Sequence, residues 1–284
     1  MWSSLVEYHR PATIDKSLRL LARSHPRTVP LAGGTWLLAE RDPRVEAVVD
    51  LSAAYLAYIS ARARSIRLGA MTTLQTLADD PIVEGISNGL IRDAIEASVR
   101  CAHRNIATIG GTIAVGGRTS EICQALLILD AQVVIRPASG NCISLDTFLY
   151  DPARYLLPGR IITEILLPRP KIRFGTSQAL VRSTPRGPSI VSASAWVARV
   201  GHVCRNARLA LGGIAPNPIR LPQIEAMVSS RKIDSALCEQ VADTVRKEIA
   251  LPTNGQPSSE YQLQMAGTVV ASALQEAWEQ VKEE

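Results

Sequence analysis

The 284-residue sequence lacks the short motifs that mark several common enzyme classes. None of its five cysteines forms a Cys-x-x-Cys pair and its four histidines are widely separated, which disfavours zinc or iron–sulfur ligation by this chain. It has no Gly-x-Ser-x-Gly, no evident Ser/His/Asp set, and no G-x-G-x-x-G fingerprint or P-loop at its two threonine-flanked glycine pairs. We therefore expect no metal site, no catalytic acid, base or nucleophile, and neither a Rossmann NAD site nor a Walker-type ATP site.

Long apolar runs and dense blocks of one charge are absent as well. No apolar run approaches the roughly 20 residues that span a bilayer, and the opening MWSSLVEYHRPATID has no basic-then-apolar signal pattern. The net charge is +5, but the arginines are scattered, which favours an ordinary solvated surface over a nucleic-acid face. The odd number of cysteines indicates reduced thiols. We expect a cytoplasmic protein with no membrane span and no nucleic-acid partner.

The first third of the sequence alternates helix-like and strand-like runs. Apolar residues recur at helical spacing after Thr13, a plausible N-cap, and again after Thr72 or Thr73. Between and around these stretches lie short apolar runs that are typical of strands. This alternation predicts an α/β layer structure. The expected helices cover residues 11–25 and 72–80, and the expected strands cover residues 27–33, 46–52 and 64–71.

The middle of the sequence predicts two helices, a hairpin and a strand. The run SEICQALLILDA is apolar on most faces, so we expect its helix to be deeply buried. A turn at Ser139–Asn141 joins the two halves of the hairpin. The expected elements are helices at 89–104 and 120–131, a hairpin at 131–149 and a strand at 160–170.

The sequence pattern changes near residue 175, where long strand-like runs begin. They predict an antiparallel sheet, followed by two helical stretches. We place the domain boundary there, with one domain at 1–174 (subdomains about 1–55 and 56–174) and a second at 175–284. The expected strands lie at 177–183, 189–201 and 202–216, and the expected helices at 234–250 and 259–282.

Two glycine pairs, in LAGGTW and TIGGTI, stand beside threonines and next to predicted helix starts. Glycine lets the backbone approach a ligand closely, and consecutive amides in such a turn can converge on an anion. A following helix adds the partial positive charge of its N-terminus. Two such loops suit a pyrophosphate held from two sides, as in a dinucleotide. Taken singly, each pair is equally consistent with a tight turn.

Four motifs stand in order around the two loops: LAGGTWLL, VVDLS, IRLGAMTTLQTL and RNIATIGGTIA. They resemble the flavin-binding medium subunit of molybdenum hydroxylases, the family of xanthine dehydrogenases and bacterial carbon monoxide dehydrogenases. The resemblance continues through ALLILDAQVVI, LLPGRIITEILLP, ARLALGGIAPNPIR and SSEYQLQMAGTVVASAL, and so covers nearly the whole chain.

The resemblance implies an α+β fold. A two-part FAD-binding domain of the vanillyl-alcohol-oxidase (PCMH) type would be followed by a smaller C-terminal α+β domain with an antiparallel sheet and helices. It also implies noncovalent FAD, because the first loop holds no histidine or cysteine. The implied cofactor-binding residues are Leu31, Ala32, Gly33, Gly34, Thr35, Trp36, Thr108, Ile109, Gly110, Gly111, Thr112, Glu121 and Ile162.

Four side chains depart from the family's usual pattern. Thr112 and Val115 stand where asparagines are usual, and Trp36 and Glu121 stand where aspartates are usual. A backbone cradle needs glycines rather than side chains, so it survives these changes. Contacts to the ribityl chain and the flavin ring are the ones affected.

By this resemblance the chain is an electron-transfer flavoprotein subunit. Its flavin would accept electrons from a 2Fe–2S centre on a small partner subunit and pass them to an external acceptor. Hydroxylation would occur at a molybdenum cofactor on a large partner subunit, in a dimer of heterotrimers. Two alternatives remain open at this point: a stand-alone flavin oxidoreductase of the same superfamily, and a flavin-poor structural subunit.

Overall fold

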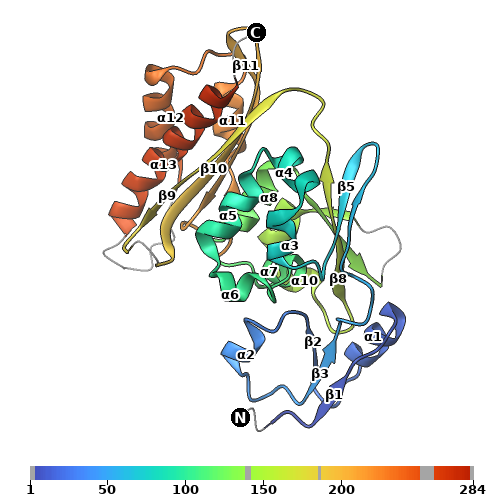
Figure 1. Ribbon diagram of the computed structural model, residues 1–284. Coiled ribbons are helices and arrows are strands. Elements are labelled where there is room, and N and C mark those ends of the chain that lie inside the picture. Colours follow the sequence, from blue (N-terminus) through green and yellow to red (C-terminus); the bar gives the residue numbers. More distant parts are fainter. Residues whose placement is uncertain (1–3, 138–141, 185–186, 250–258, 282–284) are drawn as a thin grey trace. The chain divides into compact units, whose positions relative to one another are not determined.

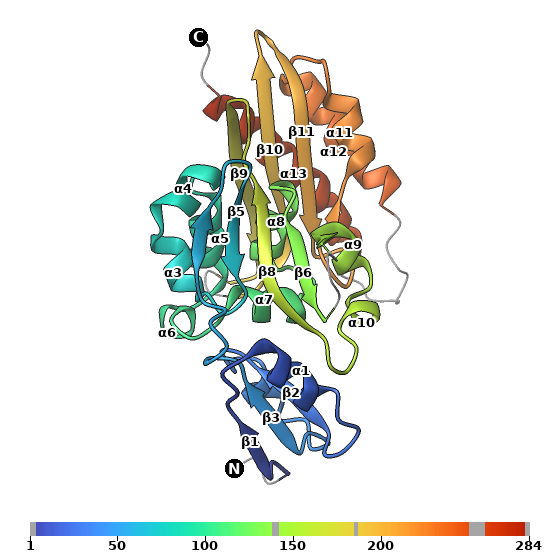
Figure 2. The same cartoon turned by 90° about the vertical axis from the view of Figure 1, so that its right-hand side faces the viewer.

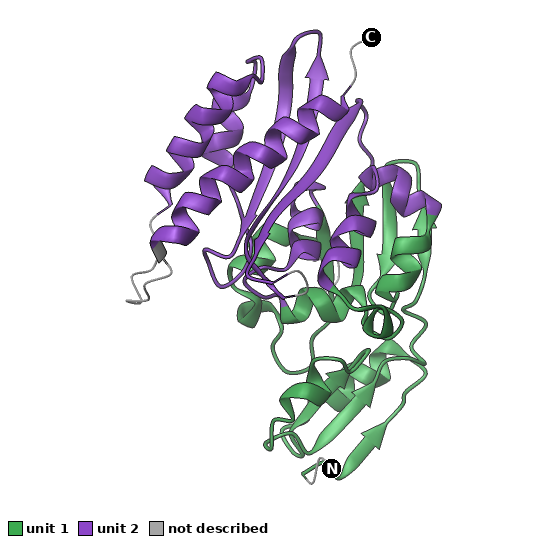
Figure 3. Cartoon of the chain, turned by 60° about the vertical axis from the view of Figure 1, so that its left-hand side comes forward, with its two compact units in different colours: residues 1–80, 99–115, 131–168 green, residues 81–98, 116–130, 169–284 purple. Residues whose placement is uncertain are grey.

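The computed structural model describes residues 4–137, 142–184, 187–249 and 259–281 (Figure 1). These residues form two compact units whose segments interleave along the chain (Figure 3). Unit 1 comprises residues 1–80, 99–115 and 131–168, and unit 2 comprises residues 81–98, 116–130 and 169–284. Among the described residues, no helix combines the length and apolarity needed to cross a bilayer.

Unit 1 contains two sheets. The first is parallel, in the order β1-β3-β2, and the second is antiparallel, in the order β4-β5-β8-β6-β7. Their strands are β1 (Glu7–His9), β2 (Thr28–Leu31), β3 (Ala47–Asp50), β4 (Ile59–Ala61), β5 (Ser65–Gly69), β6 (Gln132–Arg136), β7 (Cys142–Ser144) and β8 (Ile161–Pro168). The helices are α1 (Ile14–Leu21), α2 (Leu37–Glu40), α3 (Leu74–Asp79), α6 (Cys101–Arg104), α7 (Ile109–Val115), α9 (Leu145–Tyr150) and α10 (Pro152–Tyr155).

Unit 2 is built on one antiparallel sheet in the order β12-β11-β10-β9 (Figure 2). Nearly every residue of β10 is buried, although successive side chains of a strand point to opposite faces. Both faces of β10 are therefore covered, and α13 and α8 are the helices that contact it. The strands are β9 (Phe174–Arg182), β10 (Ser189–Val200), β11 (Val203–Gly212) and β12 (Ile219–Arg220). The helices are α4 (Pro81–Ser87), α5 (Leu90–Ser98), α8 (Glu121–Ile128), α11 (Pro222–Val228), α12 (Ser235–Glu248) and α13 (Ser259–Gln280).

Most expected elements are present, and their caps explain where they begin. Thr13 accepts a hydrogen bond from the backbone N–H of Lys16, and Thr73 accepts one from Thr76, so both are N-caps. Ser120 caps α8 in the same way, and all eight residues of that helix are buried, as its all-round apolar sequence predicts. The expectation of an antiparallel C-terminal sheet is confirmed.

Two expected elements are wrong in detail. The single helix expected over 89–104 divides into α5 and α6, because Arg100 adopts an extended conformation between them. The second half of the expected hairpin turns into α9 at Leu145, where the Ser144 side chain caps the new helix through the N–H of Thr147. The hairpin pairing itself is present, with Gln132 opposite Ser144, and its expected turn at Ser139–Asn141 lies outside the described residues.

Candidate cofactor site

The first glycine loop follows β2 in unit 1 and leads into α2. Gly34 has φ +72°, a left-handed conformation that favours glycine, and its carbonyl accepts the hydrogen bond of Leu38 that opens the helix. Among the described residues, none of the backbone N–H groups from Ala32 to Trp36 finds a hydrogen-bond acceptor. Unbonded backbone donors are normally paired with a side chain, water or a ligand. A row of them is therefore a site for an anion.

The second glycine loop, at the start of α7 in unit 1, has a different hydrogen-bond inventory. The N–H groups of Ile109 and Gly110 donate to the carbonyls of Thr72 (3.0 Å) and Ala70 (2.9 Å). The N–H of Gly111 donates to Thr108 Oγ1 (3.1 Å), and that of Thr112 to the carbonyl of Thr108 (2.9 Å). The amides at this helix start are thus bonded within the protein, and the capacity to bind an anion is concentrated in the first loop.

The two loops lie against each other within unit 1. A Cβ built on Gly33 would be 1.8 Å from the carbonyl oxygen of Ile106, so only glycine allows this approach. A Cβ built on Gly111 would be 3.0 Å from Thr108 Oγ1 and 3.8 Å from the Cβ of Ala32, so the space beside Gly111 is bounded by its own loop and by the first loop. The structure therefore brings together two segments more than 70 residues apart in sequence, as the paired-loop interpretation expects.

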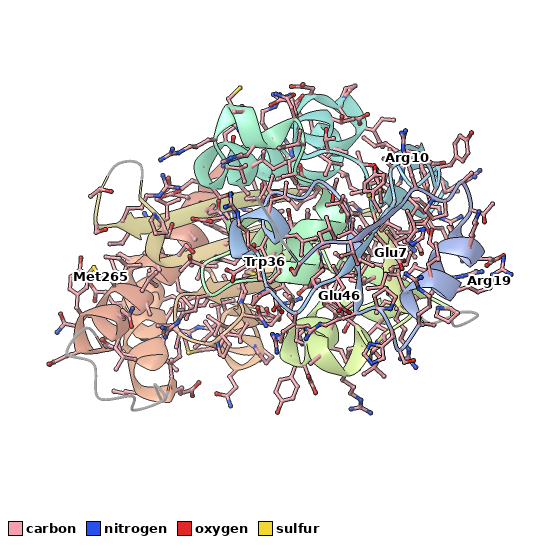
Figure 4. The ribbon with its side chains drawn as sticks, turned by 90° about the horizontal axis from the view of Figure 1, so that it is seen from below. Glu7, Arg10, Arg19, Trp36, Glu46 and Met265 are labelled. Carbon is pink, nitrogen blue, oxygen red and sulfur yellow. The ribbon has the colours of Figure 1, made fainter. Side chains whose placement is uncertain are left out.

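Three predicted side chains near the loops have clear positions. The indole of Trp36 is half exposed at the start of α2, whose own residues are not buried, so Trp36 is not a core residue (Figure 4). The Thr112 hydroxyl donates to the carbonyl of Thr108 (3.0 Å) and is held inside α7. Among the described residues, neither side chain accepts a hydrogen bond from the unbonded amides. Thr35, half buried, contributes one of these amides.

The other two predicted residues lie elsewhere. Ile162 is buried in β8 of unit 1, opposite Ile135 and next to a register shift in β6. Glu121 is the first residue of α8 and belongs to unit 2, where its buried carboxylate accepts a hydrogen bond from Ser189 and lies 3.8 Å from Arg182. The Glu121 carboxylate thus has protein partners of its own. The assignment of these residues to a cofactor stays a prediction.

A polar network in unit 1 joins the buried carboxylate of Glu164 to the partly exposed side chains of Tyr58 and Arg67. The Tyr58 hydroxyl donates to Glu164 Oε1 (2.6 Å), and the Arg67 guanidinium bonds Glu164 Oε2 through Nε (3.0 Å) and Nη2 (2.6 Å). Burial, together with the hydrogen bond to Glu164, raises the pKa of Tyr58 to about 12. Glu164 stands two residues after Ile162 in an otherwise apolar strand, and this isolated acid in a buried run is the only clue the sequence offers.

Comparison with known proteins identifies the family of this chain. A family model described as the FAD binding domain in molybdopterin dehydrogenase matches residues 4–170, more than half of the chain. The chain belongs to this family. A second model, the CO dehydrogenase flavoprotein C-terminal domain, matches residues 186–277 of this family member. The resemblance that the sequence motifs indicate is thereby confirmed, as is the α+β fold with an FAD-binding domain first. The expected boundary near residue 175 falls between the two matched stretches and stays a prediction.

Individual relatives cover nearly the full length of this FAD-binding family member. A putative xanthine dehydrogenase FAD-binding subunit of Escherichia coli is 28% identical, with 95% of each chain covered. A glyceraldehyde dehydrogenase medium chain of Sulfolobus acidocaldarius is 25% identical, covering 97% of this chain and 99% of its own. Among solved structures, carbon monoxide dehydrogenase from Hydrogenophaga pseudoflava matches with a TM-score of 0.89 at 24% identity, over 98% of this chain and 99% of the other.

The residues present fit the cofactor that the family implies. FAD carries a pyrophosphate, and the loop at Ala32–Trp36 offers a row of N–H donors without acceptors among the described residues. Members of this family are oxidoreductase components, so the expectation of an FAD-dependent oxidoreductase subunit is confirmed. When bound, FAD supplies the ability to take up and release electrons, and the protein supplies binding, orientation and electrostatic tuning.

Proposed function

We propose that this chain is the FAD-carrying, electron-transfer subunit of a molybdenum-containing hydroxylase or dehydrogenase. Electrons reach its flavin from a 2Fe–2S centre on a small partner subunit and leave to an external acceptor. Substrate oxidation takes place at a molybdenum cofactor on a large partner subunit. The complex is a dimer of such heterotrimers in the cytoplasm. The observation that carries the proposal is the row of unbonded backbone amides at Ala32–Trp36.

The names of the relatives support the division of labour. One is called an FAD-binding subunit and another a medium chain, so each is one component of a larger enzyme. Their named substrates differ, xanthine in one and glyceraldehyde in the other, although both align with this chain over almost its whole length. This supports a division in which another subunit selects the substrate. The stand-alone flavin oxidoreductase has no specific observation in its favour.

The proposal is tested by the ligands that the apoprotein prefers. FAD, FMN, riboflavin and ADP are titrated into the flavin-free full chain, and binding is followed by flavin fluorescence or calorimetry. If the free amides hold the pyrophosphate, FAD binds much more tightly than FMN or riboflavin, and ADP competes with FAD. An intact metal-containing complex that releases no FAD when it is denatured would instead establish the flavin-poor structural subunit.

A charge placed between the two loops gives a second test of the same proposal. Gly111→Asp puts a carboxylate beside Ala32, where it opposes the phosphates of FAD, so we expect affinity for FAD to fall by tenfold or more (about 1.4 kcal/mol per factor of ten). Gly85→Asp is the matched control, because a side chain at Gly85 in α4 meets no atom within 4 Å. Equal FAD affinity in both variants would contradict the placement of the pyrophosphate at this loop.

A further inference from the structure

Thr72 is a buried residue whose hydroxyl bonds the backbone of another segment. Its Oγ1 accepts a hydrogen bond from the Tyr58 N–H (3.1 Å) and donates one to the Tyr58 carbonyl (3.0 Å). The same carbonyl also accepts from the Gly69 N–H (2.8 Å), but the Tyr58 N–H has only the Thr72 hydroxyl as acceptor among the described residues. Removing the hydroxyl would leave this part-buried backbone donor without its protein acceptor.

The main chain of the same residue holds the second glycine loop. The Thr72 carbonyl accepts the N–H of Ile109, the first residue of α7 (3.0 Å). The flanking Ala70 and Leu74 complete a short ladder, through the N–H of Gly110 to Ala70 (2.9 Å) and the N–H of Leu74 to Ala107 (2.9 Å). This ladder fixes the Ile106 carbonyl region on which the first loop rests at Gly33.

Tyr58 carries the connection on to β8. Its hydroxyl bonds Glu164, which Arg67 binds on its other oxygen, and Glu164 stands two residues from Ile162. The ring of Tyr58 also lies over Gly69, where an added Cβ would be 2.8 Å from Tyr58 Cδ1. The Thr72 carbonyl thus bonds the start of α7, and the Thr72 hydroxyl bonds Tyr58. Tyr58 in turn bonds Glu164 in β8, the strand that contains Ile162.

We infer that Thr72 is a positioning residue for the flavin site, and that its hydroxyl holds Tyr58 and the α7 start in the geometry that binds FAD. The inference rests on the proposed function. Thr72 does not touch the free amides itself. It acts through the Ile106–Gly110 backbone, so loss of the hydroxyl loosens the surface on which the first loop rests.

The test compares Thr72→Val with Thr72→Ser and Thr13→Val in the full chain. Valine keeps the shape of threonine but not its hydroxyl, and serine restores the hydroxyl. Thr13→Val makes the same chemical change at the exposed N-cap of α1, also in unit 1, where the hydroxyl bonds the N–H of Lys16. FAD affinity, the visible circular dichroism of bound flavin and the melting temperature of the apoprotein are measured for each.

We expect Thr72→Val to weaken FAD binding about tenfold and to change the flavin dichroism, with Thr72→Ser within about twofold of the parent protein. Thr13→Val is expected to lower the apoprotein melting temperature without altering FAD affinity. If Thr72→Val does not fold, Tyr58→Phe decides, because it cuts the same connection at Glu164 and should weaken FAD binding.

Each adverse result has a distinct meaning. Parental FAD affinity in Thr72→Val, or in Tyr58→Phe where the first variant is unfolded, overturns the inference while the proposed function stands. A Thr72→Ser variant as weak as Thr72→Val also overturns it, since the hydroxyl would then not be the cause. Failure of the parent protein to bind FAD overturns the proposed function, and the inference with it.

Discussion

Gly33 and Gly110 lie where the protein's own backbone occupies the space that a side chain would need. A Cβ on Gly33 would meet the Ile106 carbonyl, and one on Gly110 would be 2.6 Å from the Cβ of Ala70. Valine at either position would therefore disturb the protein as well as any ligand. Gly111 differs, because a Cβ there would be 3.0 Å from Thr108 Oγ1 and 3.8 Å from the Cβ of Ala32 in the first loop, and this makes it the informative position for substitution.

The buried thiols of Cys123 and Cys204 give a prediction at the residue scale. Burial raises the pKa of each to about 11 from an ordinary value of 9.0, so the folded protein favours the neutral thiol. Their contribution to stability is fully present below pH 9 and is lost as the pH rises toward 11. At pH 8 we expect a thiol reagent to label the exposed Cys101 in the native protein and to spare Cys123 and Cys204 until unfolding.

The measurement is mass-spectrometric mapping of iodoacetamide adducts, with denatured protein as the control in which every cysteine reacts. A variant with alanine at Cys123 and at Cys204 should lose less of its free energy of unfolding between pH 9 and 11 than the parent chain. Rapid native labelling of Cys123, which is wholly buried in α8, would contradict this account.

At the scale of elements, two arginines from the sheet of unit 2 contact the C-terminal end of α8 and the residues that follow it. Arg220 donates to the Leu127 carbonyl (3.2 Å) and to Asp130 (3.0 Å), and Arg208 donates to Asp130 (2.6 Å). Cations at a helix C-terminus are favourable because the last carbonyls carry partial negative charge. Arg220 also binds both oxygens of Glu225 in α11, at 2.7 and 2.8 Å, so one guanidinium joins three elements.

Replacing Arg220 with methionine should therefore destabilise the protein by about 2–3 kcal/mol, since Glu225 and the end of α8 lose a largely buried cation. Arg246→Met is the control, because Arg246 pairs with Asp243 on the exposed face of α12 and such pairs contribute less than about 1 kcal/mol. Chemical denaturation of both variants checks the difference. An equal decrease in the free energy of unfolding of both variants would show that the Arg220 cluster stabilises the protein no more than an exposed ion pair does.

Local patterns explain why many elements could be predicted and some could not. β10 and α8 are sequences with few charged residues that are buried on all sides, and threonine or serine caps mark the starts of α1, α3 and α8. The break between α5 and α6 involves a partner that is distant in sequence: Arg182 of β9 donates to the Ala97 carbonyl near the end of α5. No local pattern encodes such a partner.

The candidate site also has features that the sequence predicts and features that depend on tertiary contacts. The glycine pairs and the family motifs predict where the two loops lie along the chain. That the amides of one loop are free while those of the other are bonded depends on the carbonyls of Ala70 and Thr72, which belong to a third segment. The roles of Thr72 and Tyr58 are invisible in the sequence for the same reason.

For the whole molecule, the interleaving of the units has a direct consequence for truncation. α8 lies within residues 1–174, yet it packs in unit 2, where Gln124 Nε2 donates to Ser192 in β10 (2.7 Å). A fragment of residues 1–174 would expose the buried apolar residues of α8. We expect this fragment to bind a hydrophobic dye and to lack a cooperative melt, whereas the full chain melts cooperatively. A cooperatively folded fragment would show that residues 1–174 are an independent domain.

The free amides of the first loop also bear on how the apoprotein should be handled. Inorganic phosphate and sulfate present the same kind of acceptor oxygens as a pyrophosphate, and backbone nests bind them readily. In a buffer that contains either ion, the ion would compete with FAD for the amides of Ala32–Trp36. The apparent affinity for FAD would then be lower than its true value. The choice of buffer anion is thus part of measuring this protein's affinity for its cofactor.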